Sequence, residues 1–155
     1  MQIALFQPDN PANVGATLRL AACLGVSVTV IEPCGFVWNH RRLRRVGLDY
    51  VERAEVVRMP SWTAFEESRK SRSNRLVLLT SQADTRFDLV RYQPDDILLA
   101  GRESLGAPPE VHASADLRVG IPLTSGSRSL NVVTAIAIVL GEALRQCNGF
   151  PTAKR

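Results

Sequence analysis

The sequence predicts an α/β fold in which helices cover both faces of a mostly parallel sheet. Three observations predict it. Short apolar segments that suit strands alternate along the chain with segments that suit helices. One of these strands, residues 26–31, is rich in β-branched residues, as buried strands are. A late segment, residues 132–140, is apolar nearly all round and must be buried in the domain or against another copy.

The first half of the chain supplies two strands and three helices. Residues 3–6 are expected to form a strand, and residues 14–24 a helix that ends at Gly25, which suits the left-handed conformation after a helix. Residues 26–31 form the second strand. A short helix is expected at residues 41–46, and Ser61 can cap a further helix that runs to residue 70.

The second half repeats the alternation. Short apolar strands are expected at residues 76–80, 97–100 and 117–121. A short helix is expected at residues 108–113, and residues 131–146 form the long last helix. Nothing in this pattern gives the order of the strands in the sheet.

Length and composition indicate a single domain. The chain has 155 residues, of which 45% are hydrophobic and 22% charged, as in soluble globular proteins. We expect the domain to span residues 1–147 and residues 148–155, with Gly149 and Pro151, to form a flexible tail. No repeat or linker indicates a second domain.

Several classes of protein are disfavoured. No apolar run approaches the roughly 20 residues that cross a bilayer, so no membrane partner is expected. The chain starts on a strand without the features of a secretory signal, which favours a cytoplasmic location. Cys23, Cys34 and Cys147 have no metal-ligand spacing and are expected as unpaired thiols, so no metal is expected.

Three segments carry motif-like polar residues. The first contains Asn13, Gly15 and Arg19, the second is Gly101-Arg102-Glu103-Ser104-Leu105-Gly106, and the third runs from Ile121-Pro122 through a loop of small residues to Ser129-Leu130-Asn131. In this order they resemble the three signature motifs of the SpoU branch of the SPOUT RNA methyltransferases. The resemblance covers roughly residues 1–146.

Two further segments narrow the resemblance. Residues 31–36, Ile-Glu-Pro-Cys-Gly-Phe, and residues 41–50, which contain four arginines in five residues, are similar to those of the TrmL group of this branch. That group methylates the ribose 2′-hydroxyl of the wobble nucleotide, position 34, in tRNA. The resemblance implies a cytidine or modified uridine at that position, leucine tRNAs as substrates, and contacts to the anticodon stem-loop.

The resemblance also implies features that the residue pattern cannot show. SPOUT domains carry a deep trefoil knot in their C-terminal part and bind S-adenosylmethionine, without a metal, in a cleft built by the knot. Carried over by position, the cofactor-binding residues are Leu79, Gly101, Ile121 and Ser129. A glycine at a strand end lets a flat ring approach the main chain, while Leu79 and Ile121 offer apolar walls.

Four residues are implied as catalytic: Arg19, Asn13, Glu103 and Asn131. Arg19 is unusual on the sequence alone, because it lies on a helix otherwise made of small and apolar residues. A guanidinium is a poor base, so we expect it to orient the ribose hydroxyl or to stabilise negative charge, with a structural ion pair as the alternative. Glu103 could pair with Arg19 or Arg128.

The two asparagines have a simpler interpretation. Asn13 could be no more than a helix N-cap, and Asn131 could cap the last helix while ordering the loop before it. His40 and His112 form no constellation with other catalytic residue types and are expected on the surface.

Arg41, Arg42, Arg44 and Arg45 are the candidate RNA-binding residues. Arginine suits bidentate contacts to phosphate, and the net charge of +4 agrees with an acidic partner. A solvated helix face is the alternative. The apolar last helix predicts a homodimer, with Ile136 and Val139 in the interface. Relatives often carry an aromatic residue near Gly141, so a contact to substrate from that position is absent here.

Two other classes of function are compatible with the sequence. The chain could be an RNA-binding module of the same fold without catalysis, or a knotted enzyme that methylates another RNA ribose. A flavodoxin-like domain would need a phosphate-binding loop after the first strand, where this chain has two prolines and no glycine-rich segment.

Overall fold

All strands of the sheet run parallel. The computed structural model describes residues 1–152, except for the side chains of His40, Arg42 and Arg44. Seven strands pair in the order β3-β2-β1-β6-β4-β7-β5, and each pairing is parallel. Their bounds are β1 Gln2–Phe6, β2 Ser27–Ile31, β3 Val56–Met59, β4 Leu76–Leu79, β5 Thr85–Arg86, β6 Ile97–Ala100 and β7 Leu117–Gly120. The predicted α/β class and parallel sheet are therefore confirmed.

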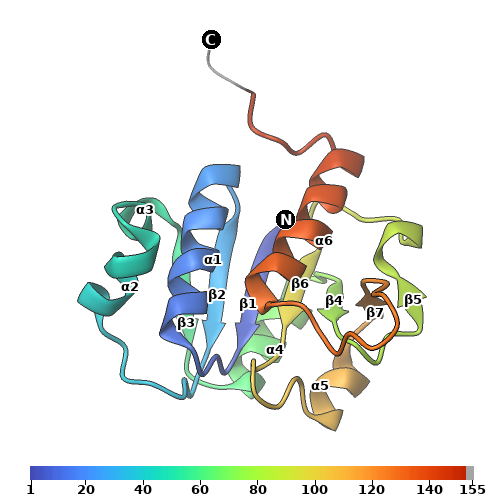
Figure 1. Cartoon of the computed structure of the whole chain (residues 1–155), viewed down its shortest axis with the longest axis horizontal. Coiled ribbons are helices and arrows are strands. Elements are labelled where there is room, and N and C mark those ends of the chain that lie inside the picture. The colour runs from blue at the N-terminus through green and yellow to red at the C-terminus, as the bar shows by residue number, and fades with distance from the viewer. Residues whose placement is uncertain (153–155) are drawn as a thin grey trace.

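Helices cover both faces of the sheet. The first core cluster joins Ile3 and Leu5 of β1 to α1 and α6, and the second joins Ala4 and Phe6 to α4 and α5. Because side chains alternate along a strand, one strand serves both cores. Figure 1 shows α1 and α6 side by side on one face. The helices are α1 Pro11–Leu24, α2 His40–Gly47, α3 Tyr50–Arg53, α4 Trp62–Ser71, α5 Pro109–Ser114 and α6 Val132–Gln146.

Helix α1 begins three residues before the expected start. Asn10 is its N-cap and accepts a hydrogen bond from the Ala12 amide at 2.9 Å, while Pro11 occupies the first turn. The helix ends at Gly25, which has the left-handed conformation with φ of 68°. The interpretation of Asn13 as an N-cap was therefore wrong, because Asn13 lies inside the helix.

Two edge strands and a short helix were not predicted. β3 is only partly buried, and β5 has two residues, so neither shows the continuous apolar run that marks the inner strands. Helix α3 has a single turn. A 3₁₀ turn, Phe87–Leu89, follows β5 and contacts α6.

Helix α6 is not buried on every side. Ile136, Val139 and Leu140 are at most 1% exposed and pack in the domain's own core. The opposite face carries Ile138, which is 37% exposed, and Gly141, where an added Cβ would meet no atom within 4 Å. The expectation that Ile136 and Val139 lie in a dimer interface was therefore wrong.

Helix α2 is placed by close packing against α1. A Cβ on Gly15 would lie 2.8 Å from the Leu43 carbonyl oxygen, and a Cβ on Gly47 would lie 2.8 Å from the Gly15 carbonyl oxygen. The glycine of the first motif thus lets the arginine-bearing helix approach α1. Within residues 1–152, no helix is long and apolar enough to cross a membrane. The three cysteines are free thiols, as predicted.

Candidate active site

A cavity of about 530 Å³ opens where three neighbouring strands end. It lies beyond the carboxyl ends of β4, β6 and β7 and is closed by the segment that leads from β7 to α6. Such strand ends are the usual ligand site of parallel α/β sheets. The structure brings all four candidate cofactor residues, Leu79, Gly101, Ile121 and Ser129, to the lining of this cavity.

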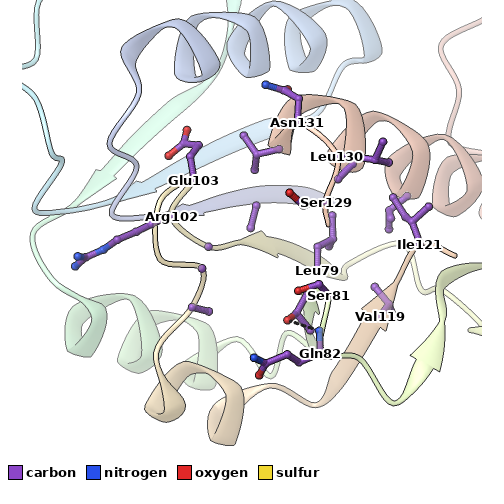
Figure 2. Close-up of a pocket in the computed structure, with 18 of the residues that line it drawn as sticks. Leu79, Ser81, Gln82, Arg102, Glu103, Val119, Ile121, Ser129, Leu130 and Asn131 are labelled. Atoms are coloured by element: carbon purple, nitrogen blue, oxygen red, sulfur yellow. Dashed lines mark hydrogen bonds between the residues drawn. The ribbon is translucent and has the colours of Figure 1, made fainter. Parts of the chain in front are cut away.

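The cavity has apolar walls and a polar mouth. Figure 2 shows Ser129 beside Leu79, with Val119 and Ile121 on one side and Glu103 on the other. Arg102 points away and places its guanidinium over the Phe6 ring, 5.8 Å from its centroid. Apolar walls with a few polar groups are typical of sites that bind small molecules.

Gly101 is required by the loop that follows it. Arg102 and Gly106 exchange two backbone hydrogen bonds of 3.0 and 2.9 Å, so residues 102–106 double back on themselves. A Cβ on Gly101 would lie 2.5 Å from the Gly106 carbonyl carbon and 2.6 Å from the Ala107 nitrogen. The fold of the loop therefore requires a glycine here, and access of a ligand ring to the main chain stays a prediction.

One hydrogen-bonded chain links the three motif segments at the mouth of the cavity. The Asn131 side-chain amide donates to the Asn13 side-chain oxygen at 3.1 Å. The Asn13 amide in turn donates to Glu103 Oε1, also at 3.1 Å. Candidate residues that lie far apart in the sequence are therefore in contact.

Helix α6 sets the direction of these hydrogen bonds. Asn131 is its N-cap, and its Oδ1 accepts from the backbone amides of Val133 at 2.9 Å and Thr134 at 3.4 Å. Because Oδ1 is used by these donors, Nδ2 of Asn131 must face Asn13, and Asn13 must donate to Glu103. The interpretation of Asn131 as the cap of the last helix is confirmed, while its role in ordering the preceding loop stays a prediction.

Asp9 extends this chain and was missed by the sequence reasoning. Its backbone amide donates to Glu103 Oε2 at 3.1 Å, and its carboxylate accepts from the hydroxyl and amide of Ser104. Partial desolvation and the contact with Asp9 raise the pKa of Glu103, whereas hydrogen bonds from Glu103 and Ser104 lower the pKa of Asp9. The two carboxyl groups therefore differ in acidity, with Asp9 the more acidic of the pair. The position of Asp9, in the loop that follows the carboxyl end of β1, is the signal that could have identified it.

The expected partners of Glu103 were wrong. It contacts Asn13 and Asp9 rather than Arg19 or Arg128. Arg128 lies elsewhere on the cavity lining, as do Ser81, Gln82 and His112. His112, expected as an uninvolved surface residue, is thus part of the cavity wall.

Arg19 lies on the exposed side of α1, away from this cavity. It is six residues after Asn13, a rotation of about 240° along a helix, so the two side chains leave α1 in different directions. The guanidinium of Arg19 lies over the Tyr50 ring, 5.5 Å from its centroid, and Arg53 approaches the same ring at 5.6 Å. Arg19 is therefore the one candidate catalytic residue that does not line the cavity.

The candidate RNA-binding arginines lie on α2. Arg41 and Arg45 are exposed to solvent. The side chains of Arg42 and Arg44 lie outside the described part of the structure. No group of residues with the composition of a metal site occurs within residues 1–152.

Comparison with known proteins was consistent with this geometry. The SpoU rRNA Methylase family model matches residues 1–141. A protein of Beijerinckia indica named tRNA (cytidine(34)-2'-O)-methyltransferase is 53% identical over 144 residues, which are 93% of this chain and 90% of the relative. A protein of the same name from Escherichia coli K12 is 38% identical over 155 residues, 99% of this chain and 97% of the relative.

Solved structures show the same similarity. One described as "Structural insights into the 2-OH methylation of C/U34 on tRNA" superimposes with a TM-score of 0.89 at 34% identity and covers 94% of both chains. The SpoU methyltransferase AviRb of Streptomyces viridochromogenes, solved with its cofactor AdoMet, superimposes with a TM-score of 0.83 at 25% identity. That match covers 94% of this chain and 60% of AviRb.

Proposed function

Because this chain belongs to the SpoU rRNA methylase family, we propose that it transfers a methyl group from S-adenosylmethionine to the ribose 2′-hydroxyl of nucleotide 34 in tRNA. The observation that carries the proposal is the hydrogen-bonded chain of Glu103, Asn13 and Asn131 at the mouth of the cavity. Relatives that cover nearly the whole chain are named for this reaction.

The residues of the cavity fit S-adenosylmethionine. Leu79 and Ile121 flank a space that suits an adenine ring, Gly101 marks the turn of the loop beside it, and the Ser129 hydroxyl reaches the same space. A neighbour of the same fold was solved with this cofactor. When bound, the cofactor supplies an electrophilic methyl group on a sulfonium, so no metal is needed for the transfer.

The chain's own residues position the nucleophile. Methyl transfer requires the 2′-hydroxyl to be held in line with the methyl group, and this positioning accounts for much of the rate. Asn13, Asn131 and Glu103 fix the loops that form the mouth of the cavity, where the ribose would enter. A guanidinium near the 2′-oxygen would stabilise the negative charge that develops as the proton leaves.

Arg19 can supply this guanidinium only to the cavity of a second copy. It projects from the exposed side of α1, about 240° around the helix from Asn13. We therefore place Arg19 of one protomer at the mouth of its partner's cavity. A homodimer is then a requirement of the reaction.

A surface suited to this homodimer runs along α1 and α6. On α1 it includes Ala16 and Cys23 beside Arg19, and on α6 it includes Ile138 and Gly141. The two helices pack side by side on one face of the sheet. Small and apolar side chains on neighbouring helices allow two copies to approach closely, and leaving them in water would be unfavourable.

The family's trefoil knot is a further part of this proposal. The chain passes from β4 to β5 at the sheet edge and returns to β6 before it forms β7 and α6. On the way back it contacts α6, where the Gln146 side chain donates to the Val90 carbonyl at 3.0 Å and accepts from the Tyr92 amide at 3.0 Å. A late helix held inside an earlier crossing of the chain is the arrangement that a knot requires.

Helix α2 is the element that we propose to bind tRNA. Its exposed arginines, Arg41 and Arg45, suit phosphates of the tRNA anticodon stem-loop. We propose leucine tRNAs as the substrates, in the cytoplasm. One domain over residues 1–147 would carry the reaction, with residues 148–155 as a tail.

A methyl-transfer assay tests the proposal against its alternatives. The purified protein would be incubated with methyl-labelled S-adenosylmethionine and with tRNA or ribosomal RNA in parallel. Label in tRNA supports the proposal. Label in ribosomal RNA alone indicates another RNA ribose, while RNA binding without cofactor binding in calorimetry indicates a non-catalytic module.

A further inference from the structure

A second recess lies at the same edge of the sheet as the cavity, beyond the ends of β2 and β3. It has a volume of about 420 Å³. Its lining combines two aromatic rings, a guanidinium, a carboxylate and prolines: Glu32, Pro33, Phe36, Trp38, Arg58 and Pro60. None of these residues belongs to the hydrogen-bonded chain at the mouth of the first cavity.

The recess is built around a stack of planar groups. Phe36 and Trp38 lie nearly parallel, with an interplanar angle of 20° and ring centroids 6.3 Å apart. The guanidinium of Arg58 lies over Trp38, 4.9 Å from the ring centroid, and is held there by an ion pair with Glu32. Both aromatic side chains are only half-buried, so part of the stack faces solvent.

These groups suit an unpaired nucleobase. Aromatic rings and arginine planes are the surfaces on which single-stranded bases stack. Arg58 is itself part of the stack and has further N–H donors besides the one that contacts Glu32, so it can also meet the edge of a base. A phosphate would make no use of the aromatic rings, and a purely apolar ligand would form no hydrogen bonds with the ion pair. A nucleobase can contact both.

The position of the recess relates it to the reaction. The amide of Gly35, which lies in the chain between the lining residues Cys34 and Phe36, donates to the Pro8 carbonyl at 2.9 Å. The residue after Pro8, Asp9, contacts Glu103 at the cavity mouth. On its other side the chain runs from Trp38 directly into α2, which carries the exposed Arg41 and Arg45. The recess therefore lies between the site of chemistry and a basic helix.

We propose that this recess binds an unpaired base of the tRNA anticodon loop, next to the nucleotide that is methylated. The inference rests on the proposed function. In this proposal Trp38 and Phe36 stack on the base, and Arg58 and Glu32 form hydrogen bonds with its edge. Substrate choice then depends on a second pocket as well as on the one that holds the reacting ribose.

Tryptophan fluorescence tests this directly. The chain has two tryptophans, and Trp62 packs in a separate aromatic group with Phe6 and Phe65. In a Trp62→Phe variant all tryptophan emission comes from Trp38. We expect an anticodon stem-loop RNA to quench this emission in a saturable manner, and a fully paired duplex to have little effect. A Trp38→Phe variant, which reports from Trp62, should show no quenching.

Kinetics provide the second readout. Trp38→Leu should raise the KM for tRNA about 5- to 100-fold, the effect of losing a stacking ring, with the cofactor Kd unchanged. Trp38→Phe should recover most of this loss. Phe150→Leu, at a half-exposed aromatic residue four positions after the end of α6, is the matched control and should leave the KM unchanged.

The failure of this inference can be distinguished from failure of the proposed function. If the unaltered protein methylates tRNA but RNA binding does not change Trp38 emission, the recess does not hold a base. If Trp38→Leu turns a dimer into a monomer, the recess is covered by a second copy, and the inference is wrong. If the unaltered protein methylates no tRNA, the proposed function itself fails.

Discussion

Asn131 and Asn13 are joined by a 3.1 Å hydrogen bond between their side chains, although 118 positions separate them in the sequence. Asn131 caps α6 and Asn13 lies in α1, so this bond ties the starts of two long helices together at the mouth of the cavity. The Asn13 side-chain amide also donates a hydrogen bond to Glu103. Asn13 therefore connects residues of all three motif segments through its side chain.

Removing this link should reduce catalysis more than stability. We expect Asn13→Ala to lower kcat at least 10-fold, because a loop displaced by a small distance misaligns the reacting groups. The matched control is Asn10→Ala, which removes the N-cap of α1 and should cost about 1 kcal/mol of stability. Steady-state kinetics and urea unfolding of both variants test this expectation. Equal activity in the two variants would show that the link is structural only.

Mixing of two inactive variants tests whether Arg19 acts across a dimer. Arg19→Ala leaves the cavity intact, while Gly101→Val forces apart the loop that lines it. Each homodimer should be nearly inactive. A mixed dimer contains one intact cavity and, on the opposite protomer, one intact Arg19, so activity should return when the variants are denatured together and refolded. Absence of recovery, with mixed dimers demonstrated by sedimentation or tagging, would place Arg19 at its own cavity or outside the reaction.

The dimer surface itself makes a distinct prediction. Ile138→Glu should yield a folded monomer, because Ile138 is 37% exposed on the outer face of α6. Ile136→Glu should unfold the chain instead, since that side chain is fully buried in the domain. Leu89→Glu, at a 72% exposed position, is the control that should keep the dimer. Analytical ultracentrifugation with circular dichroism separates these outcomes, and a dimeric Ile138→Glu protein would rule out this surface.

The arginines of α2 should contribute through phosphate contacts. Replacing Arg41 and Arg45 with Gln should raise the Kd for tRNA and reduce the logarithmic salt slope by about 1.4 to 1.8, with the cofactor Kd unchanged. Arg72→Gln, at an exposed arginine at the end of α4, is the control. Binding measured over a range of salt concentrations decides the matter. An unchanged slope in the double variant would mean that α2 presents only a solvated face.

The sequence predicted the inner part of the fold and most of the candidate site. The inner strands are continuous apolar runs, and Leu79, Gly101 and Ile121 stand at their carboxyl ends, where a parallel sheet gathers its ligand contacts. The edge strands β3 and β5 were missed because they are short and only partly buried.

Other features depended on distant contacts that no local pattern reveals. Asp9 acquires its role only because the loop after β6 returns to the loop after β1. Position 101 must be a glycine because the backbone of Gly106 and Ala107 lies against it once the loop has folded back. The direction of Arg19, in contrast, could have been inferred, since six positions along a helix separate it from Asn13.

Mapping of the methyl group on a synthetic anticodon stem-loop tests the central claim most directly. The RNA would be incubated with the protein and S-adenosylmethionine, digested, and analysed by mass spectrometry. The account predicts one added methyl group, on the ribose of nucleotide 34, and none when that nucleotide alone carries a 2′-deoxyribose. Methylation of the deoxy substrate, or of any other nucleotide in place of 34, would contradict it.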